Sequence, residues 1–154
     1  MLYLAFNALD ASYRLITMLK LETIFHKEAL LVQVDPDHNF LKAVWLKQPT
    51  SSEFRKYILL VTEYALARNI KIALFDIRRR SYMEYCDQNW TLKEIFPLFE
   101  GNFVKFAYLT KIEGLDLMDT LRLQEAQDNS TLQKTTFKIE HFLDEEQALT
   151  WLFE

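Results

Sequence analysis

The first half of the chain shows an alternation of apolar and polar residues that predicts three strands. Met18–Phe25 alternates with a period of two, and two further apolar runs follow, Ala29–Asp35 and Phe40–Lys47. Between these two runs lies Asp35-Pro36-Asp37-His38-Asn39, whose proline and Asx residues are typical of a turn. We therefore predict an antiparallel hairpin near the start of the domain.

The pattern changes to a helical period after Pro49. Thr50 and Glu53 have the spacing of a capping box, in which each side chain accepts a hydrogen bond from the other residue's backbone N–H. Asn69 can adopt the left-handed conformation that ends a helix. Between them, apolar residues recur three and four positions apart and predict one buried stripe: Phe54, Tyr57, Ile58, Val61 and Ala65.

Strands and helices alternate through the rest of the chain. The further predicted strands are Ile70–Ile77, Phe103–Thr110 and Thr135–Phe142. The predicted helices are Trp90–Phe99, which Pro97 should bend or end, Gly114–Asn129, with apolar positions at Leu117, Met118 and Leu121, and a closing helix capped by Asp144-Glu145-Glu146-Gln147.

The order β-β-β-α-β-α-β-α-β-α predicts an α/β fold. Strand–helix alternation implies right-handed crossovers and parallel strands. We expect a mixed, mainly parallel sheet of five to six strands, with an N-terminal antiparallel hairpin and about four helices on at least one face. Residues 18–154 form a single domain in this interpretation. Residues 1–17 are either a loosely attached extension or an amphipathic helix docked on that domain.

Composition narrows the classes of function. Half of the 154 residues are apolar and 26% are charged, as in folded globular domains. The net charge of −4 argues against nucleic acid as the main partner, and the presence of only two glycines excludes glycine-rich phosphate loops. No apolar run is long enough for a transmembrane helix. With Cys86 as the single cysteine, we expect a cytoplasmic protein without an intramolecular disulfide.

Several segments together resemble a known family. The hairpin Ala29–Lys47, the capped helix after Pro49, the strand ending at Asp76 and the closing segment Phe142–Leu152 look like bacterial STAS-type domains, which are related to anti-sigma-factor antagonists. The resemblance is to a poorly characterised branch and covers roughly residues 18–154. It implies a STAS-like fold and a non-catalytic regulatory or ligand-sensing module.

The family's phosphoswitch motif does not transfer to this chain. Members that act as phosphoswitches carry a serine in an Asp-Ser-Ser-Gly-type turn at the start of a helix. This sequence has Asp76-Ile77-Arg78-Arg79-Arg80-Ser81 at that point, without a glycine. A phosphorylatable serine is therefore not assigned.

The candidate binding site is the connection after the strand that ends near Ile77. Residues 78–89 span twelve positions, whereas connections in α/β units typically have about 2–6 residues. Ligands of parallel sheets bind beyond the carboxyl ends of the strands, where Gln48–Ser52 and Lys111–Gly114 should also lie. Guanidinium groups and aromatic rings suit a protein partner or a small anionic ligand. The candidate binding residues are Asp76, Arg78, Arg79, Arg80, Ser81, Tyr82, Tyr85 and Trp90.

Other interpretations of the same residues stay open. The three arginines can be solvated or paired with the chain's own carboxylates, while the aromatic residues cover the end of the sheet. The 14% aromatic content also allows a carrier or sensor of an apolar, lipid-like ligand. An enzyme of unknown class would use Asp76, Cys86 or a tyrosine.

The sequence predicts neither a cofactor nor a metal site. His26, His38 and His141 fall on different predicted elements, without the spacing of metal ligands. A homodimer is compatible with Trp151 and Phe153 near the chain end, because exposed aromatic residues often mark interfaces.

Overall fold

The computed structural model describes residues 13–14, 16–113, 115–129 and 136–154. Within these residues, the strands form one sheet whose order follows the chain, β1-β2-β3-β4-β5-β6. Neighbouring strands pair antiparallel from β1 to β3 and parallel from β3 to β6. The predicted mixed, mainly parallel α/β sheet is confirmed. The strands are β1 Glu22–His26, β2 Leu30–Asp35, β3 Phe40–Trp45, β4 Ile72–Asp76, β5 Lys105–Leu109 and β6 Lys138–Phe142.

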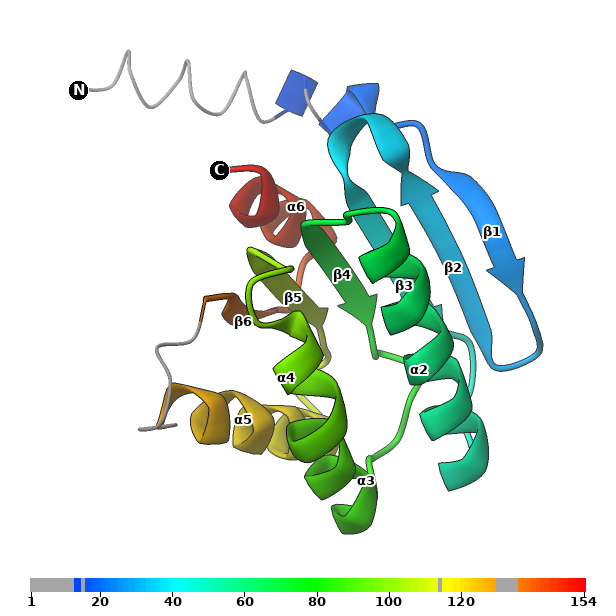
Figure 1. Cartoon of the computed structure of the whole chain (residues 1–154), viewed down its shortest axis with the longest axis vertical. Coiled ribbons are helices and arrows are strands. Elements are labelled where there is room, and N and C mark those ends of the chain that lie inside the picture. Colours follow the sequence, from blue (N-terminus) through cyan, green and yellow to red (C-terminus); the bar gives the residue numbers. More distant parts are fainter. Residues whose placement is uncertain (1–12, 15, 114, 130–135) are drawn as a thin grey trace.

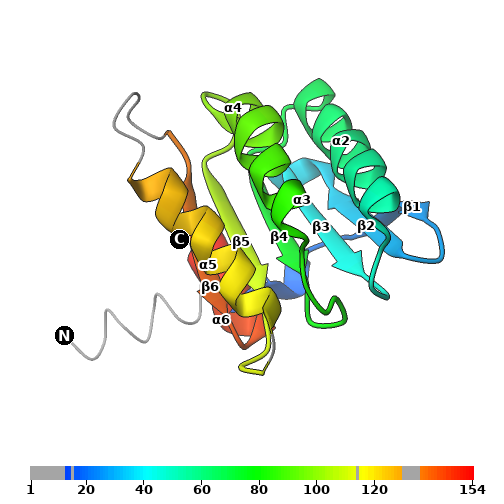
Figure 2. The same cartoon turned by 90° about the horizontal axis from the view of Figure 1, so that it is seen from below.

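Helices cover both faces of the sheet. They are α2 Ser51–Ala67, α3 Tyr85–Trp90, α4 Phe96–Phe99, α5 Leu115–Asp128 and α6 Glu145–Phe153. Each crossover between β3 and β6 leads to the next parallel strand, and because such crossovers are right-handed, their helices share one face. Figures 1 and 2 show α2, α3, α4 and α5 on that face and α6 on the other. None of the described helices has the length and hydropathy of a membrane span.

The core has one apolar cluster on each face of the sheet. Trp45, Phe75 and Phe106 belong to the larger cluster, under α2, α3 and α4. Phe40 and Leu74 belong to the smaller one, under α6. Ile16 and Leu19 pack against the smaller cluster. Of the predicted N-terminal extension 1–17, residues 1–12 and 15 lie outside the described part of the chain.

The first strand is shorter than its alternating pattern predicts. The strand expected over Met18–Phe25 is observed at Glu22–His26, with an irregular register between Thr23 and Phe25. The backbone N–H of Lys20 donates instead to Asp35 Oδ2, at 2.9 Å. Asp35 therefore fixes the backbone just before β1, and it also fixes the turn between β2 and β3.

The helix predicted over Trp90–Phe99 starts earlier, and Pro97 does not end it. α3 begins at Tyr85 and continues into α4 through a π-helical turn, Thr91–Ile95. Proline lacks an N–H and its ring displaces the carbonyl four residues earlier. The turn widens accordingly, and the N–H of Phe96 bonds to the carbonyl of Thr91. About half of the long connection is thus helical, and it places Tyr85 and Trp90 on the same helix.

The side of α5 that packs against the sheet differs from the side that its apolar pattern predicts. Met118 and Leu121, predicted as part of its apolar stripe, are 68% and 45% exposed, so that prediction is wrong. Among the α5 side chains that the structure describes, the buried ones are Asp119, Thr120, Leu123 and Gln127. Residue 114, the predicted start, lies outside the described residues, and so does the side chain of Leu117. α5 therefore buries three polar side chains beside Leu123 and leaves two apolar side chains exposed to solvent.

Replacing Thr50 by alanine should lower the free energy of unfolding by ~1 kcal/mol, because the predicted capping box is present. Thr50 Oγ1 accepts from the N–H of Glu53 at 3.1 Å, and Glu53 Oε1 accepts from the N–H of Thr50 at 3.2 Å. Urea unfolding followed by tryptophan fluorescence measures the loss. Thr50→Ser keeps the acceptor and should stay close to wild type; equal losses in both variants would contradict a capping role.

Candidate functional site

Gln48 fixes the start of the long connection after β4. Its Oε1 accepts from the N–H of Ser81 at 2.6 Å and from the N–H of Tyr82 at 3.2 Å, and its Nε2 donates to the Tyr82 carbonyl at 2.9 Å. Two of the segments predicted to meet at the carboxyl edge therefore do so. Ser81 and Tyr82 are held there through their backbone, which leaves both side chains exposed.

Asp76 and Arg78 pair with each other. Asp76 Oδ1 accepts from Arg78 Nε at 3.0 Å and Oδ2 accepts from Arg78 Nη2 at 2.7 Å, so both carboxylate oxygens are occupied. The hydrogen bond to Asp76 raises the pKa of Arg78, and the charge of Glu145 at the start of α6 adds to the effect. Arg78, paired with Asp76, thus interacts electrostatically with Glu145 at the start of α6.

Arg79 and Arg80 face opposite environments. Arg79 is exposed and forms no ion pair with any described residue. Arg80 is 1% exposed, and its Nη2 donates to Asp119 Oδ1 of α5 at 2.9 Å. The second oxygen of Asp119 accepts from the backbone N–H of Met83. Arg80 therefore binds α5 to the connection from inside, and its guanidinium is not part of the surface.

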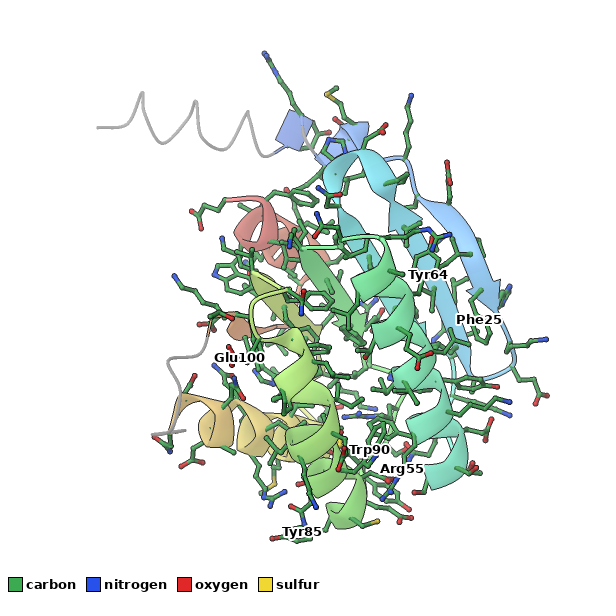
Figure 3. The ribbon with its side chains drawn as sticks, viewed as in Figure 1. Phe25, Arg55, Tyr64, Tyr85, Trp90 and Glu100 are labelled. Carbon is green, nitrogen blue, oxygen red and sulfur yellow. The ribbon has the colours of Figure 1, made fainter. Side chains whose placement is uncertain are left out.

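Tyr82 and Tyr85 lie beside an open hollow between α3 and α5. Their side chains are 43% and 66% exposed, and Figure 3 shows Tyr85 at the outer end of α3. The guanidinium of Arg122, from α5, lies over the Tyr85 ring at 4.3 Å from its centre. The hollow is lined by Tyr82, Met83, Tyr85, Gln88, Met118, Asp119 and Arg122.

Trp90 faces α2 and does not line this hollow. Arg55 lies 5.4 Å from the centre of its ring, and Phe54 packs edge-on at 6.2 Å; Figure 3 shows Trp90 and Arg55 side by side. The buried Asp87 joins the same two helices, accepting from Arg55 Nε at 2.7 Å and from Ser51 Oγ at 2.8 Å. The predicted site residues are therefore divided among three environments.

Three side chains of types that can bind a metal ion lie close together at the start of α3. Ligand atoms of Glu84, Cys86 and Asp87 lie within 4.8 Å of one another. Asp87 is the only buried member and already binds Arg55 and Ser51. The contact between α3 and α2 accounts for Asp87, whereas Glu84 and Cys86 are exposed.

A small cavity lies inside the larger core cluster. It has a volume of about 20 Å³ and is lined mostly by aromatic and aliphatic side chains, together with Arg80, Thr91 and Tyr108. Arg80 Nε is buried and has no hydrogen-bond partner among the described residues. This volume matches one water molecule, since a water needs at least about 10–15 Å³ of such space. It is far below the volume of a lipid chain.

His141 of β6 is held in one tautomer beneath α5. Gln124 Nε2 donates to the carbonyl of Ile139 at 2.9 Å, which leaves Gln124 Oε1 to face His141 Nδ1 at 2.7 Å. Nδ1 therefore carries the proton. Nε2 is buried and has no partner among the described residues, and the ring stacks on Tyr108 at 5.1 Å. Burial lowers the pKa of His141 to about 4.

The sequence-based site omits the residues that α5 contributes. Met118, Asp119 and Arg122 lie 29 to 33 positions after residue 89, the end of the connection, and a local pattern does not join them to it. The sequence carries one indication of this contribution, because the polar residues Asp119 and Thr120 interrupt the apolar positions of the predicted helix. The sequence predicts Gln48 only as the first residue of a segment, Gln48–Ser52, that should lie at the same edge.

No family model matches this sequence, and no curated protein matches it. Solved structures similar to this chain include apo-SiaC from Pseudomonas aeruginosa, with 18% sequence identity and a TM-score of 0.42 over 79% of this chain and 99% of that chain. Another structure of SiaC from the same organism has 15% identity and a TM-score of 0.44, covering 80% of this chain and 100% of that chain. No residue of this chain is assigned a role from these structures.

Asp119→Ala should lower the free energy of unfolding by about 3–5 kcal/mol, because it leaves the Arg80 guanidinium buried without its carboxylate. Arg80→Met should cost a similar amount. The double variant Arg80→Met, Asp119→Leu replaces both charges by apolar groups and should recover much of the loss. Urea unfolding of the four proteins gives the coupling energy. Additive single and double effects would contradict a direct pair.

Acidification should destabilise the protein through His141. An unfolded histidine takes up its proton near its ordinary pKa of 6.5, whereas folded His141 does so only near 4. The unfolded state therefore binds more protons between these pH values, and stability falls as the pH drops through that window, by about 2–3 kcal/mol.

His141→Phe keeps a ring against Tyr108 and should flatten this pH dependence between pH 6.5 and 4. The matched control is His26→Phe, at an exposed position of β1, which should keep the wild-type slope. Chemical denaturation at a series of pH values measures both variants. An unchanged slope in His141→Phe would show that other groups cause the loss.

Proposed function

We propose that this chain is a non-catalytic interaction module that binds a partner protein through its α3–α5 surface. This surface consists of Tyr82, Tyr85, Met118 and Arg122, which line the hollow, and of Leu121, which is exposed on α5 three residues after Met118. The proposal keeps the predicted location at the carboxyl edge of the sheet and two of the predicted residues, and it adds three from α5.

The inverted orientation of α5 is the observation that carries this proposal. Helices at a protein surface normally bury their apolar side and expose a polar one. α5 buries Asp119, Thr120 and Gln127 together with Leu123, and it leaves Met118 and Leu121 exposed to water. A partner that covers these apolar side chains removes the cost of their exposure, at roughly 25 cal/mol per Å² of apolar surface.

The composition of the surface also supports an interface. Tyrosine, methionine and arginine are enriched at protein–protein interfaces, and tyrosine and arginine are frequent among residues that dominate binding energy. Tyr85 and Arg122 stack on each other, so both side chains are ordered before a partner arrives and less entropy is lost on binding.

The other candidate functions have weaker support. A carrier of an apolar ligand needs an enclosed volume, whereas the cavity under α3 has about 20 Å³. An enzyme using Asp76 would need that carboxylate to be available, but both of its oxygens bind Arg78. The resemblance to STAS-type domains also supports a regulatory module over an enzyme.

A photo-crosslinking residue in place of Tyr85 tests the proposal in cells that produce the chain. We expect a discrete covalent adduct with a partner, and Met118→Glu in the same chain should abolish it by placing a charge in the apolar surface. Leu59→Glu, at an exposed apolar position of α2, is the matched control and should leave the adduct unchanged. Adducts that survive Met118→Glu would refute the assignment of this surface.

A further inference from the structure

The guanidinium of Arg122 is held in place by neutral groups, so no carboxylate among the described residues neutralises its charge. Nη1 donates to Gln88 Oε1 at 2.6 Å and Nη2 donates to Asn89 Oδ1 at 3.0 Å, and both acceptors are neutral amides. The face of the Tyr85 ring supplies a third contact. Among the described residues, the Nε–H and one N–H on each Nη have no partner. This geometry leaves donors suited to a carboxylate.

The buried carboxylates nearest to this position are already neutralised. Asp119 binds Arg80 and the N–H of Met83. Asp87 binds Arg55 and Ser51. Each pair satisfies its own charges, so neither carboxylate compensates Arg122. An anion that completes the hydrogen bonding of Arg122 must therefore be sought outside these two pairs.

The shape of the hollow favours a peptide over a small molecule. Small-molecule sites enclose roughly 70–90% of their ligand. Tyr82, Tyr85 and Met118, which line this hollow, are themselves 43%, 66% and 68% exposed. Such an open surface cannot enclose a small anion, but an extended chain can cover α3 and α5 and contact several of these side chains at once.

The charge of the chain argues against two other occupants. A net charge of −4 opposes an extended anionic membrane surface, which interacts with the whole face of the protein, more than a short peptide that contacts only the surroundings of Arg122. A second copy would offer the acidic start of α6 to Arg122. However, Asp144 caps α6 by accepting from the N–H of Gln147 at 2.9 Å, and Glu145 pairs with Lys42. Two of the three carboxylates at this helix start, those of Asp144 and Glu145, are therefore engaged within the chain.

We infer that the α3–α5 surface binds an acidic peptide segment of a partner protein. A carboxylate of the segment pairs with the guanidinium of Arg122, and an adjacent aromatic or aliphatic side chain packs between Tyr85 and Met118. This inference rests on the proposed function and specifies the chemistry of the partner.

Selection from a phage-displayed library of random 12-residue peptides on the full chain tests the inference. Selected peptides should carry Asp or Glu next to an aromatic or aliphatic residue. Fluorescence anisotropy with the synthesised peptides should show that Arg122→Gln weakens binding by about tenfold or more. Added salt should weaken binding to the wild-type chain more than binding to Arg122→Gln, because the variant lacks the charge pair.

Arg68→Gln is the matched control for this experiment. Arg68, next to the end of α2, lies over the ring of Tyr64 at 4.3 Å, the same separation as between Arg122 and Tyr85. It does not line the hollow. The control should bind the selected peptides as the wild-type chain does, whereas an equal loss in both variants would overturn a specific role for Arg122.

The outcomes separate the inference from the proposed function. Neutral or basic peptides that need Tyr85 but tolerate Arg122→Gln would overturn the acidic partner and keep the binding surface. Peptides that bind equally well to Tyr85→Ala and Arg122→Gln would overturn both. A dimer in sedimentation that Met118→Glu dissociates would replace the partner peptide with a second copy of the chain.

Discussion

The buried ion pair between Arg80 and Asp119 is the constraint on which the candidate site depends. A guanidinium that is 1% exposed is strongly destabilising unless a carboxylate accompanies it. α5 supplies that carboxylate, so residue 119 of this helix must face inward. With about 100° between successive residues of a helix, Met118 and Leu121 are then rotated toward solvent. Because Thr120 and Leu123 are buried beside Asp119, the exposure of Met118 and Leu121 follows from this inward side of α5 as a whole.

Further polar contacts hold α5 in the same orientation. Gln127 Nε2 donates to Glu100 Oε1 at 2.9 Å, and Gln124 bridges His141 and the carbonyl of Ile139. Rotating α5 to bury Met118 would break these hydrogen bonds and separate Asp119 from Arg80. Each broken contact leaves a buried polar group unsatisfied, at a cost of about 1–3 kcal/mol. α5 is therefore oriented by polar complementarity, and its apolar side chains remain available to a partner.

Local patterns predicted those parts of the fold that local interactions determine. The hairpin and the capped start of α2 depend on residues within a few positions of each other, and both are observed. The side to which Arg80 points depends on Asp119, thirty-nine residues later. The position of Arg122 depends on Gln88 and Asn89 in the same way. Such pairs have no signature in a single sequence.

The sequence pattern predicts the helical period of α5 correctly but predicts the wrong buried side, and the reason is physical. A periodic pattern predicts the buried side of a helix on the premise that the interior is apolar. Here the interior opposite α5 contains Arg80 and His141, so polar residues match it better than Met118 does. Where an apolar stripe remains exposed although its helix is docked, the unsatisfied apolar surface is itself a sign of a missing partner.

The sequential order of the strands explains why the site is a surface and not a cleft. Enclosed ligand sites of open parallel sheets form where the strand order reverses and adjacent connections diverge to opposite faces. The order here runs without reversal from β1 to β6, and α2, α3 and α5 lie side by side on one face. At this edge the connections after β3 and β4 border one hollow, lined by residues that include Gln48, Tyr82 and Asp87, and α3 and α5 border the other. The proposed surface at this edge consists of helix ends and ring faces, and it would suit a partner large enough to span α3 and α5.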